Sequence, residues 1–111
     1  MNNRYQTFAK LFKTLADPNR LKIIDILSCG EKCACDILEE FQFTQPTLSH
    51  HMKVLIDSGL VNSRKQGLWH FYRLNPERSH QVKQFLTELI SETDACICHE
   101  QAVCSSLEQV R

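Results

Sequence analysis

The sequence has no apolar run that approaches the roughly 18 residues needed to span a bilayer. Its N-terminal residues also lack the apolar stretch of a secretory signal, so we expect a cytoplasmic protein with no membrane partner. We find no internal repeat, low-complexity tract or linker, and 111 residues suit a single domain. Six cysteines are too few for the disulfide-dense secreted class. Because cytosolic thiols stay reduced, clustered cysteines favour metal binding or redox chemistry over disulfide bridges.

The formal net charge is zero, because 13 basic residues balance 13 acidic residues. An even balance argues weakly against a nucleic-acid partner, but the charges are unevenly distributed. Residues 44–73 contain four lysines and arginines and three histidines against one acid, whereas residues 74–111 contain six acids and three basic residues. A basic segment within a balanced chain is typical of a small DNA-binding module.

The hydrophobic pattern is mainly that of helices. Apolar spacing, proline at helix starts and glycine at helix ends predict helices at about residues 3–15, 18–29, 34–41, 45–57 and 76–92. Between the last two, an alternating, aromatic-rich segment (residues 60–74) surrounds a glycine-containing turn and predicts a β-hairpin of two strands. A short helix, a tight turn, a longer helix and a hairpin wing together predict a mainly α winged helix-turn-helix fold.

Two segments follow from that pattern. Residues 1–92 are expected to form the winged helix-turn-helix domain for DNA binding and dimerisation, and residues 93–111 a cysteine-containing C-terminal tail. The first and last helices carry apolar faces larger than a small core needs. Ordinary core packing and a two-fold interface both explain those faces, and we favour a homodimer.

The second helix of a helix-turn-helix lies in the major groove of double-stranded DNA, with its N-terminal residues at the base edges. Arg64, Lys65 and Gln66 at the predicted wing tip would lie along the DNA backbone or minor groove. A polar helix face can also be merely solvated. The preceding turn, the following wing and the basic charge favour DNA, whereas His51 is expected to be partly packed. The predicted DNA-binding residues are Gln45, Thr47, Ser49, His50, Lys53, Arg64, Lys65 and Gln66.

The cysteines form two clusters. One lies at the entrance to the first helix of the helix-turn-helix and the other opens the tail. A buried cysteine is often only a small hydrophobe, but thiolates are soft ligands, and Lys32 and a helix N-terminus favour the thiolate form. The candidate metal ligands are Cys33 and Cys35 as the primary pair, with Cys29, Cys96, Cys98 and Cys104 as additional candidates.

Helix geometry suggests how such a site could act on DNA binding. Residues i and i+2 of a regular helix lie about 200° apart, so the sulfurs of Cys33 and Cys35 should diverge if both residues are helical. We therefore expect that one ion can bind both sulfurs only by distorting the first turn of this helix. That turn sets the position of the DNA-reading helix, so bound metal and DNA affinity would be coupled by strain.

Three stretches of sequence resemble the arsenical-resistance repressors of the ArsR/SmtB family, Gram-positive type. They are residues 27–38 with their Glu-x-Cys-x-Cys-Asp motif, residues 45–53 and residues 64–67, within a similarity that covers about residues 8–75. The resemblance implies a homodimeric winged-helix repressor of an arsenic-resistance operon. It further implies that As(III) or Sb(III) is the inducer, that the repressor then leaves the operator, and that no organic cofactor is needed.

The resemblance also implies which cysteines bind the inducer. Cys33 and Cys35 match metalloid-binding cysteines of the family. Some members place a third sulfur where this chain has Leu38, so Cys29 or a tail cysteine must replace it, or only two sulfurs bind.

Other functions fit the same features less well. A redox-sensing repressor, a cadmium-, lead- or zinc-sensing repressor of the same fold, and structural zinc shared by both cysteine pairs all stay open. Cadmium and lead sensors add N-terminal cysteines, which are lacking before Cys29, and zinc sensors use an Asp-x-His where this chain has Arg78 before His80. A thiol-dependent reductase would need an acid–base partner in a pocket, and no Cys-x-x-Cys is present, so we expect no enzyme.

Overall fold

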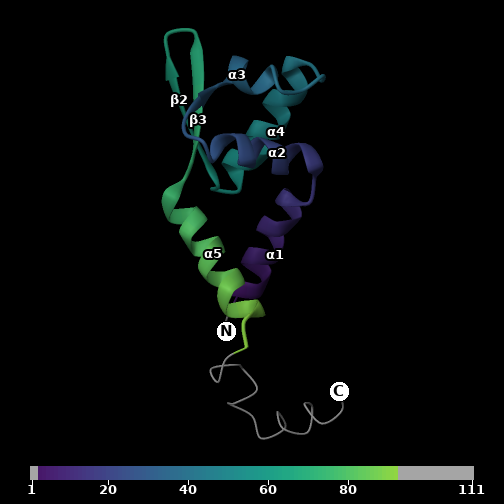
Figure 1. Ribbon diagram of the computed structural model, residues 1–111, viewed down its shortest axis with the longest axis vertical. Coiled ribbons are helices and arrows are strands. Elements are labelled where there is room, and N and C mark those ends of the chain that lie inside the picture. Colours follow the sequence, from purple (N-terminus) through teal and green to yellow (C-terminus); the bar gives the residue numbers. More distant parts are fainter. Residues whose placement is uncertain (1–2, 93–111) are drawn as a thin grey trace, which may run out of the picture.

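The computed structural model describes residues 3–92, so the tail cysteines Cys96, Cys98 and Cys104 lie outside the described residues. The fold is mainly helical with a small antiparallel sheet, as the sequence predicted (Figure 1). Within residues 3–92, no helix combines the length and apolar content that crossing a bilayer requires. The elements are α1 (Arg4–Leu15), α2 (Pro18–Leu27), β1 (Lys32–Cys33), α3 (Ala34–Leu38), α4 (Gln45–Asp57), β2 (Val61–Gln66), β3 (Trp69–Leu74) and α5 (Pro76–Ile90).

Side-chain caps fix where two of the helices begin. The Asp17 carboxylate accepts hydrogen bonds from the backbone N–H groups of Asn19 (2.8 Å) and Arg20 (3.2 Å) at the start of α2. The Asn75 side chain accepts two equivalent bonds, of 3.1 and 3.3 Å, at the start of α5. Both helices then open with proline, which loses nothing there because the first N–H groups of a helix have no partner within it. These sequence signals therefore placed both helix starts correctly.

The core joins the helix-turn-helix to the base of the hairpin. Its fully buried side chains come from α2, α3, α4 and the first residue of β2, and they are Ile23, Leu27, Ile37, Leu48, Met52, Leu55 and Val61. The apolar face of α4 is thus fixed against α2 and α3, and its opposite face is left to solvent. Because a closely packed core leaves few voids, the direction of α4 is sensitive to movements of α2 and α3.

The sheet has a third strand that the sequence analysis missed. Its order is β1-β3-β2, with both pairs antiparallel. In β1, Lys32 lies opposite Tyr72 and Cys33 opposite Phe71. A strand of two residues has too few positions to show the alternation from which strands are predicted. The prediction of a two-stranded hairpin was therefore incomplete, and one candidate cysteine belongs to the sheet.

Helix α3 is shorter than predicted. It ends at Leu38 instead of continuing to residue 41. The chain then turns so that the rings of Phe41 and Phe43 stack with centroids 4.5 Å apart, and both rings pack against the core. The apolar residues that suggested a longer helix serve this turn, because aromatic burial outweighs one more turn of helix.

Helices α1 and α5 converge at the end of the molecule opposite the hairpin (Figure 1). The rings of Phe8 and Phe85 are stacked with centroids 4.1 Å apart, and Arg4 forms an ion pair with Glu88 at 3.9 Å. This contact holds the first and last helices together and leaves apolar side chains of both on the surface.

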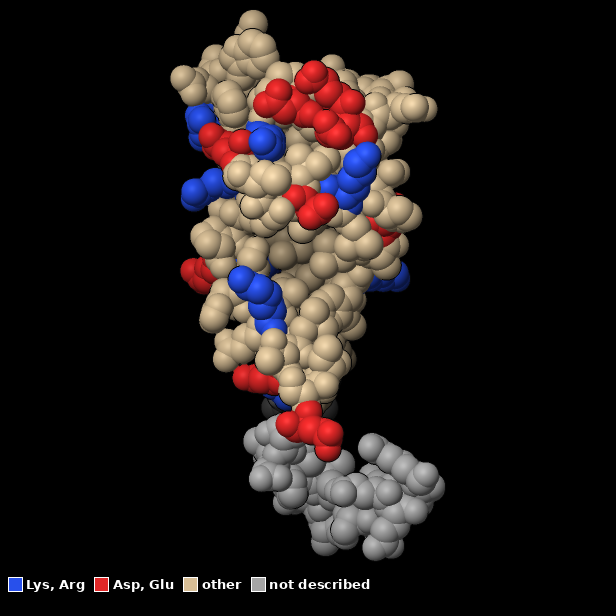
Figure 2. All heavy atoms as spheres, in the orientation of Figure 1, with Lys and Arg blue, Asp and Glu red and all other residues tan. Residues whose placement is uncertain are grey.

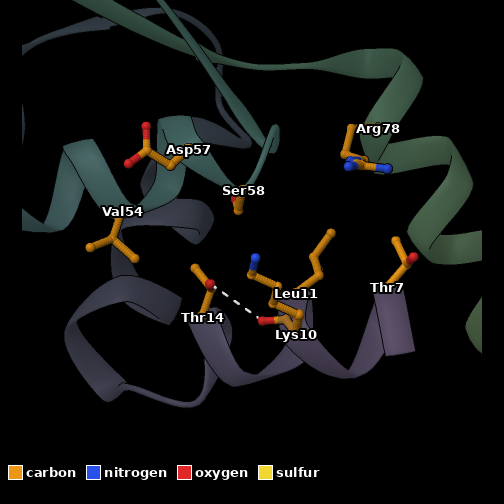
Figure 3. Close-up of a pocket in the computed structure, with 8 residues that line it drawn as sticks. All are labelled: Thr7, Lys10, Leu11, Thr14, Val54, Asp57, Ser58 and Arg78. Carbon is orange, nitrogen blue, oxygen red and sulfur yellow. Dashed lines mark hydrogen bonds between the residues drawn. The ribbon is translucent and has the colours of Figure 1, made fainter. Parts of the chain in front are cut away.

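A cavity of about 590 Å³ lies between α1, the end of α4 and α5 (Figure 3). Lys10, Asp57 and Arg78 bring charged groups to it from three different helices. Arg78 also covers Gly59, where an added Cβ would lie 3.0 Å from its Nε and the backbone φ is +85°. Both constraints explain why glycine follows the end of α4. Among residues 3–92 no cysteine lines this cavity, so it is separate from Cys29, Cys33 and Cys35.

Candidate nucleic-acid interface and metal centre

Helix α4 presents the predicted DNA-reading side chains to solvent. Its apolar face is buried, and all five polar residues proposed on it are exposed, namely Gln45, Thr47, Ser49, His50 and Lys53. In Figure 2, acidic side chains gather over the position of α3, where Asp36, Glu39 and Glu40 are all exposed. Because that acidic surface repels phosphate, the charge distribution favours α4 over α3 as the helix that meets DNA.

The wing is the β2–β3 hairpin, which turns at Gly67 and Leu68. Gly67 has a φ of +62°, as a two-residue hairpin turn requires. Gln66 pairs with Trp69 beside the turn, and Lys65 with His70 one position lower. These two predicted DNA contacts therefore lie close to the tip. Arg64 is one position lower again, opposite Phe71 in the same hairpin.

Arg64 is already engaged within the protein. It donates hydrogen bonds of 2.8 Å to both carboxylate oxygens of Glu31, and one of 2.9 Å to Gln66 Oε1. Its guanidinium carbon lies 4.4 Å from the centroid of the Phe71 ring. The hydrogen bonds from Arg64 lower the pKa of the Glu31 carboxyl. A DNA phosphate would have to compete with Glu31 for Arg64.

His51 is buried on the inner face of α4, more deeply than the sequence suggested. Arg20 donates a hydrogen bond of 3.2 Å from Nη1 to His51 Nδ1, and a second of 2.7 Å to the Thr14 carbonyl. Burial lowers the pKa of His51, an effect that the Asp17 carboxylate opposes and the Arg20 charge reinforces. The neutral imidazole thus links α4, through Arg20, to α2 and to the end of α1.

We expect this histidine to make the fold weaker in mild acid. Because the folded-state pKa of His51 lies below its ordinary value of 6.5, its contribution is complete above that pH and is lost as pH falls through the folded pKa. Urea unfolding between pH 7.5 and 5 should show the free energy of unfolding falling with pH. His51→Gln should flatten that dependence, whereas His50→Gln, at the exposed neighbouring position, should not. Equal slopes in all three proteins would contradict the assignment.

The two primary cysteines lie side by side at the start of α3. Cys33 is the N-cap residue, with extended backbone angles (φ −80°, ψ 159°), and its Sγ accepts a hydrogen bond of 3.3 Å from the Asp36 N–H. Cys35 follows in the first turn, and the two sulfurs are in contact and form a disulfide. The expectation that these sulfurs diverge was therefore wrong, because Cys33 lies in β1 and precedes the helix. One ion could reach both without unwinding α3.

A carboxylate that the sequence analysis did not select joins this pair. Ligand atoms of Cys33, Cys35 and Asp36 all lie within 4.8 Å of one another. Asp36 stands three residues after Cys33, a spacing that could have indicated a shared side of the first turn. Cys29 is exposed and lies outside this group, and Leu38 is half-buried at the position where some relatives have a third sulfur. The group offers two sulfurs and one oxygen.

Comparison with known proteins gives these features a context. The family model described as "Bacterial regulatory protein, arsR family" matches residues 17–63. An arsenical resistance operon repressor of Staphylococcus xylosus is 51% identical over 85% of this chain and 90% of its own length. The repressor of the same description from Staphylococcus aureus is 49% identical over the same shares. A homodimeric winged helix-turn-helix DNA-binding domain from Mycobacterium bovis is 28% identical, with a TM-score of 0.62, over 76% of this chain and 81% of that one.

Proposed function

Since this chain belongs to the ArsR family of bacterial transcriptional repressors, we propose that it controls an arsenic-resistance operon and leaves the operator when As(III) or Sb(III) binds Cys33 and Cys35. The observation that carries the proposal is the convergence of two cysteine sulfurs at the first helix of the helix-turn-helix. Both staphylococcal relatives support an arsenical inducer.

The donor set suits a trivalent metalloid. Thiolates are soft ligands and prefer soft acceptors. In the reduced protein, two thiols would condense with As(OH)₃, forming two As–S bonds and releasing two water molecules, with no change in the oxidation state of arsenic. The third position would be held by hydroxide, by the Asp36 carboxylate or by a cysteine of the tail.

Contacts of the cysteine pair suggest how binding would reach DNA. Cys33 lies opposite Phe71 in the sheet, and Phe71 lies opposite Arg64 on its other side. A change at Cys33 therefore reaches the wing directly through β3 and is two strands away from Arg64. Cys35 belongs to α3, which packs on α4 through the core. A ligand can shift the DNA-binding equilibrium only if it binds the two states differently, and movement of β1 against the wing would supply that difference in place of helix unwinding.

We infer that the chain dimerises through α1 and α5. Their exposed apolar side chains are Tyr5, Leu86, Leu89 and Ile90, the last with 77% of its surface exposed. A two-fold axis beside this patch would bury it against its own copy. Two α4 helices could then enter successive major grooves about 34 Å apart, so the operator should be an imperfect palindrome.

Sequence-specific contact is tested at the first residue of α4. Gln45→Ala should weaken binding to the specific operator by about 1–3 kcal/mol, because a glutamine can pair with an adenine edge through two hydrogen bonds. Lys65→Ala in the wing should weaken binding to any DNA and make it less dependent on salt. Fluorescence anisotropy with operator and random duplexes at several salt concentrations separates the two effects. Unchanged operator binding by Gln45→Ala would mean that another element reads the bases.

A redox-sensing repressor is the second candidate, and the disulfide between Cys33 and Cys35 favours it. In that case peroxide would oxidise the two thiols to the disulfide and be reduced to two water molecules. Operator release should be measured with arsenite in the presence of a non-thiol reductant, and with peroxide in its absence. Release by arsenite under reducing conditions supports the metalloid sensor. Release by peroxide with no response to arsenite would replace it with the redox sensor.

A further inference from the structure

A second cavity, of about 200 Å³, opens beside Cys35. It lies between α3, the N-terminus of α4 and the tip of the wing, which stand at the same end of the molecule (Figure 1). Its remaining walls are mostly apolar and include Leu38, Leu48, Leu68, Trp69, Gln45 and His70. A thiol that we assign to arsenic binding thus faces an apolar space bounded by both DNA-contacting elements.

We propose that this cavity binds the organic group of a monosubstituted trivalent arsenical, R–As(III), whose arsenic is held by Cys33 and Cys35. The inference rests on the proposed function of these two cysteines as the arsenic site. R–As(OH)₂ condenses with two thiols to form two As–S bonds and two water molecules, and both the As–C bond and the trivalent state are retained. Such an arsenical needs only two sulfurs, which is the number that the described part of the chain brings together.

The dimensions of the cavity select the kind of organic group. An apolar cavity of about 150 Å³ can hold a benzene ring, so about 200 Å³ is enough for one phenyl group. Ligands of drug size need about 300–1,000 Å³ and would not fit. Leu68 and Trp69 are 95% and 58% exposed, so a bound ring would cover apolar surface that water now contacts.

The position of the cavity makes an occupant able to affect DNA binding directly. Gln45 is the first residue of α4, and Trp69 pairs with Gln66 in the wing. A ring between them would fix the separation of α4 and the wing. DNA binding also needs a defined separation of these two elements. We therefore expect aryl arsenicals to release the operator at lower concentrations than arsenite does.

The full-length protein, reduced with a non-thiol reductant, should be titrated with phenylarsine oxide and with arsenite. Trp69 is the single tryptophan of the chain, so its fluorescence reports directly on the cavity. Dithiothreitol is a dithiol without a cavity. Competition with it gives the ratio of affinities for phenylarsine oxide and arsenite that two thiols alone produce. The protein should exceed that preference by about tenfold, and Trp69 emission should change more with phenylarsine oxide than with arsenite.

Leu68→Ser removes an apolar wall at an exposed turn. Its preference for phenylarsine oxide over arsenite should fall to near that of dithiothreitol. Leu21→Ser is the matched control, because Leu21 is an exposed leucine of α2 that does not line the cavity. A wild-type preference equal to that of dithiothreitol, with arsenite still bound, would overturn the cavity assignment alone. Equal loss in both variants would also overturn it. Binding of neither arsenical would overturn the proposed function as well.

Discussion

Replacing both Cys33 and Cys35 with serine is expected to abolish arsenite-induced release while operator binding without arsenite stays near wild type. Serine keeps the size and the hydrogen-bonding capacity of the N-cap at position 33 but cannot form As–S bonds. Coupling between an inducer and DNA is typically about 5–150-fold in affinity. In the wild type, arsenite should weaken operator binding by a factor in that range, and in the variant by none. Fluorescence anisotropy under reducing conditions measures both.

The other cysteines supply the controls for this experiment. Cys29→Ser should respond like the wild type, because Cys29 lies outside the group formed by the primary pair. A triple serine variant at Cys96, Cys98 and Cys104 should also respond, with lower sensitivity if the tail provides a third sulfur. If arsenite released the operator from the Cys33/Cys35 variant but not from the tail variant, the arsenite site would lie in the tail and β1 would have no part in the mechanism.

Local sequence signals predicted the parts of the fold that depend on neighbouring residues. Asp17 and Asn75 before proline marked two helix starts, and glycine marked the ends of α2 and α4. The spacing of Leu48, Met52 and Leu55 identified the buried face of α4 and therefore the exposed face on which the DNA contacts were placed. Each of these signals works over a few residues, which is why one sequence was enough to predict them.

Features that depend on distant residues could not be predicted in this way. Strand β1 forms because Lys32 and Cys33 pair with residues of β3, about 40 residues later in the chain. No local sequence pattern predicts that pairing. The ion pair between Glu31 and Arg64 spans 33 residues. The wrong expectation that the two sulfurs diverge follows from β1, because Cys33 was assigned to the helix and lies in the strand before it. The cavity beside Cys35 likewise needs three elements to be in place.

Breaking the apolar patch on α5 should reduce operator affinity by about 100-fold or more, because two linked recognition helices gain that much over one. Leu86→Glu with Leu89→Glu places two charges where a second copy would bury apolar side chains, and both positions are exposed in the single chain. The variant should therefore fold and yet sediment as a monomer at micromolar concentration. Its circular dichroism should match the wild type, since the core between α2, α3 and α4 is untouched.

Gln84→Glu is the matched control, because Gln84 is exposed and lies at least about 120° around α5 from Leu86, Leu89 and Ile90. This variant should remain dimeric and bind the operator as the wild type does. A half-site duplex, which offers one major-groove site, should bind the wild type and the double glutamate variant with similar affinity. If the double variant stays dimeric and binds the full operator normally, the interface lies elsewhere, and the exposed leucines of α5 need another explanation.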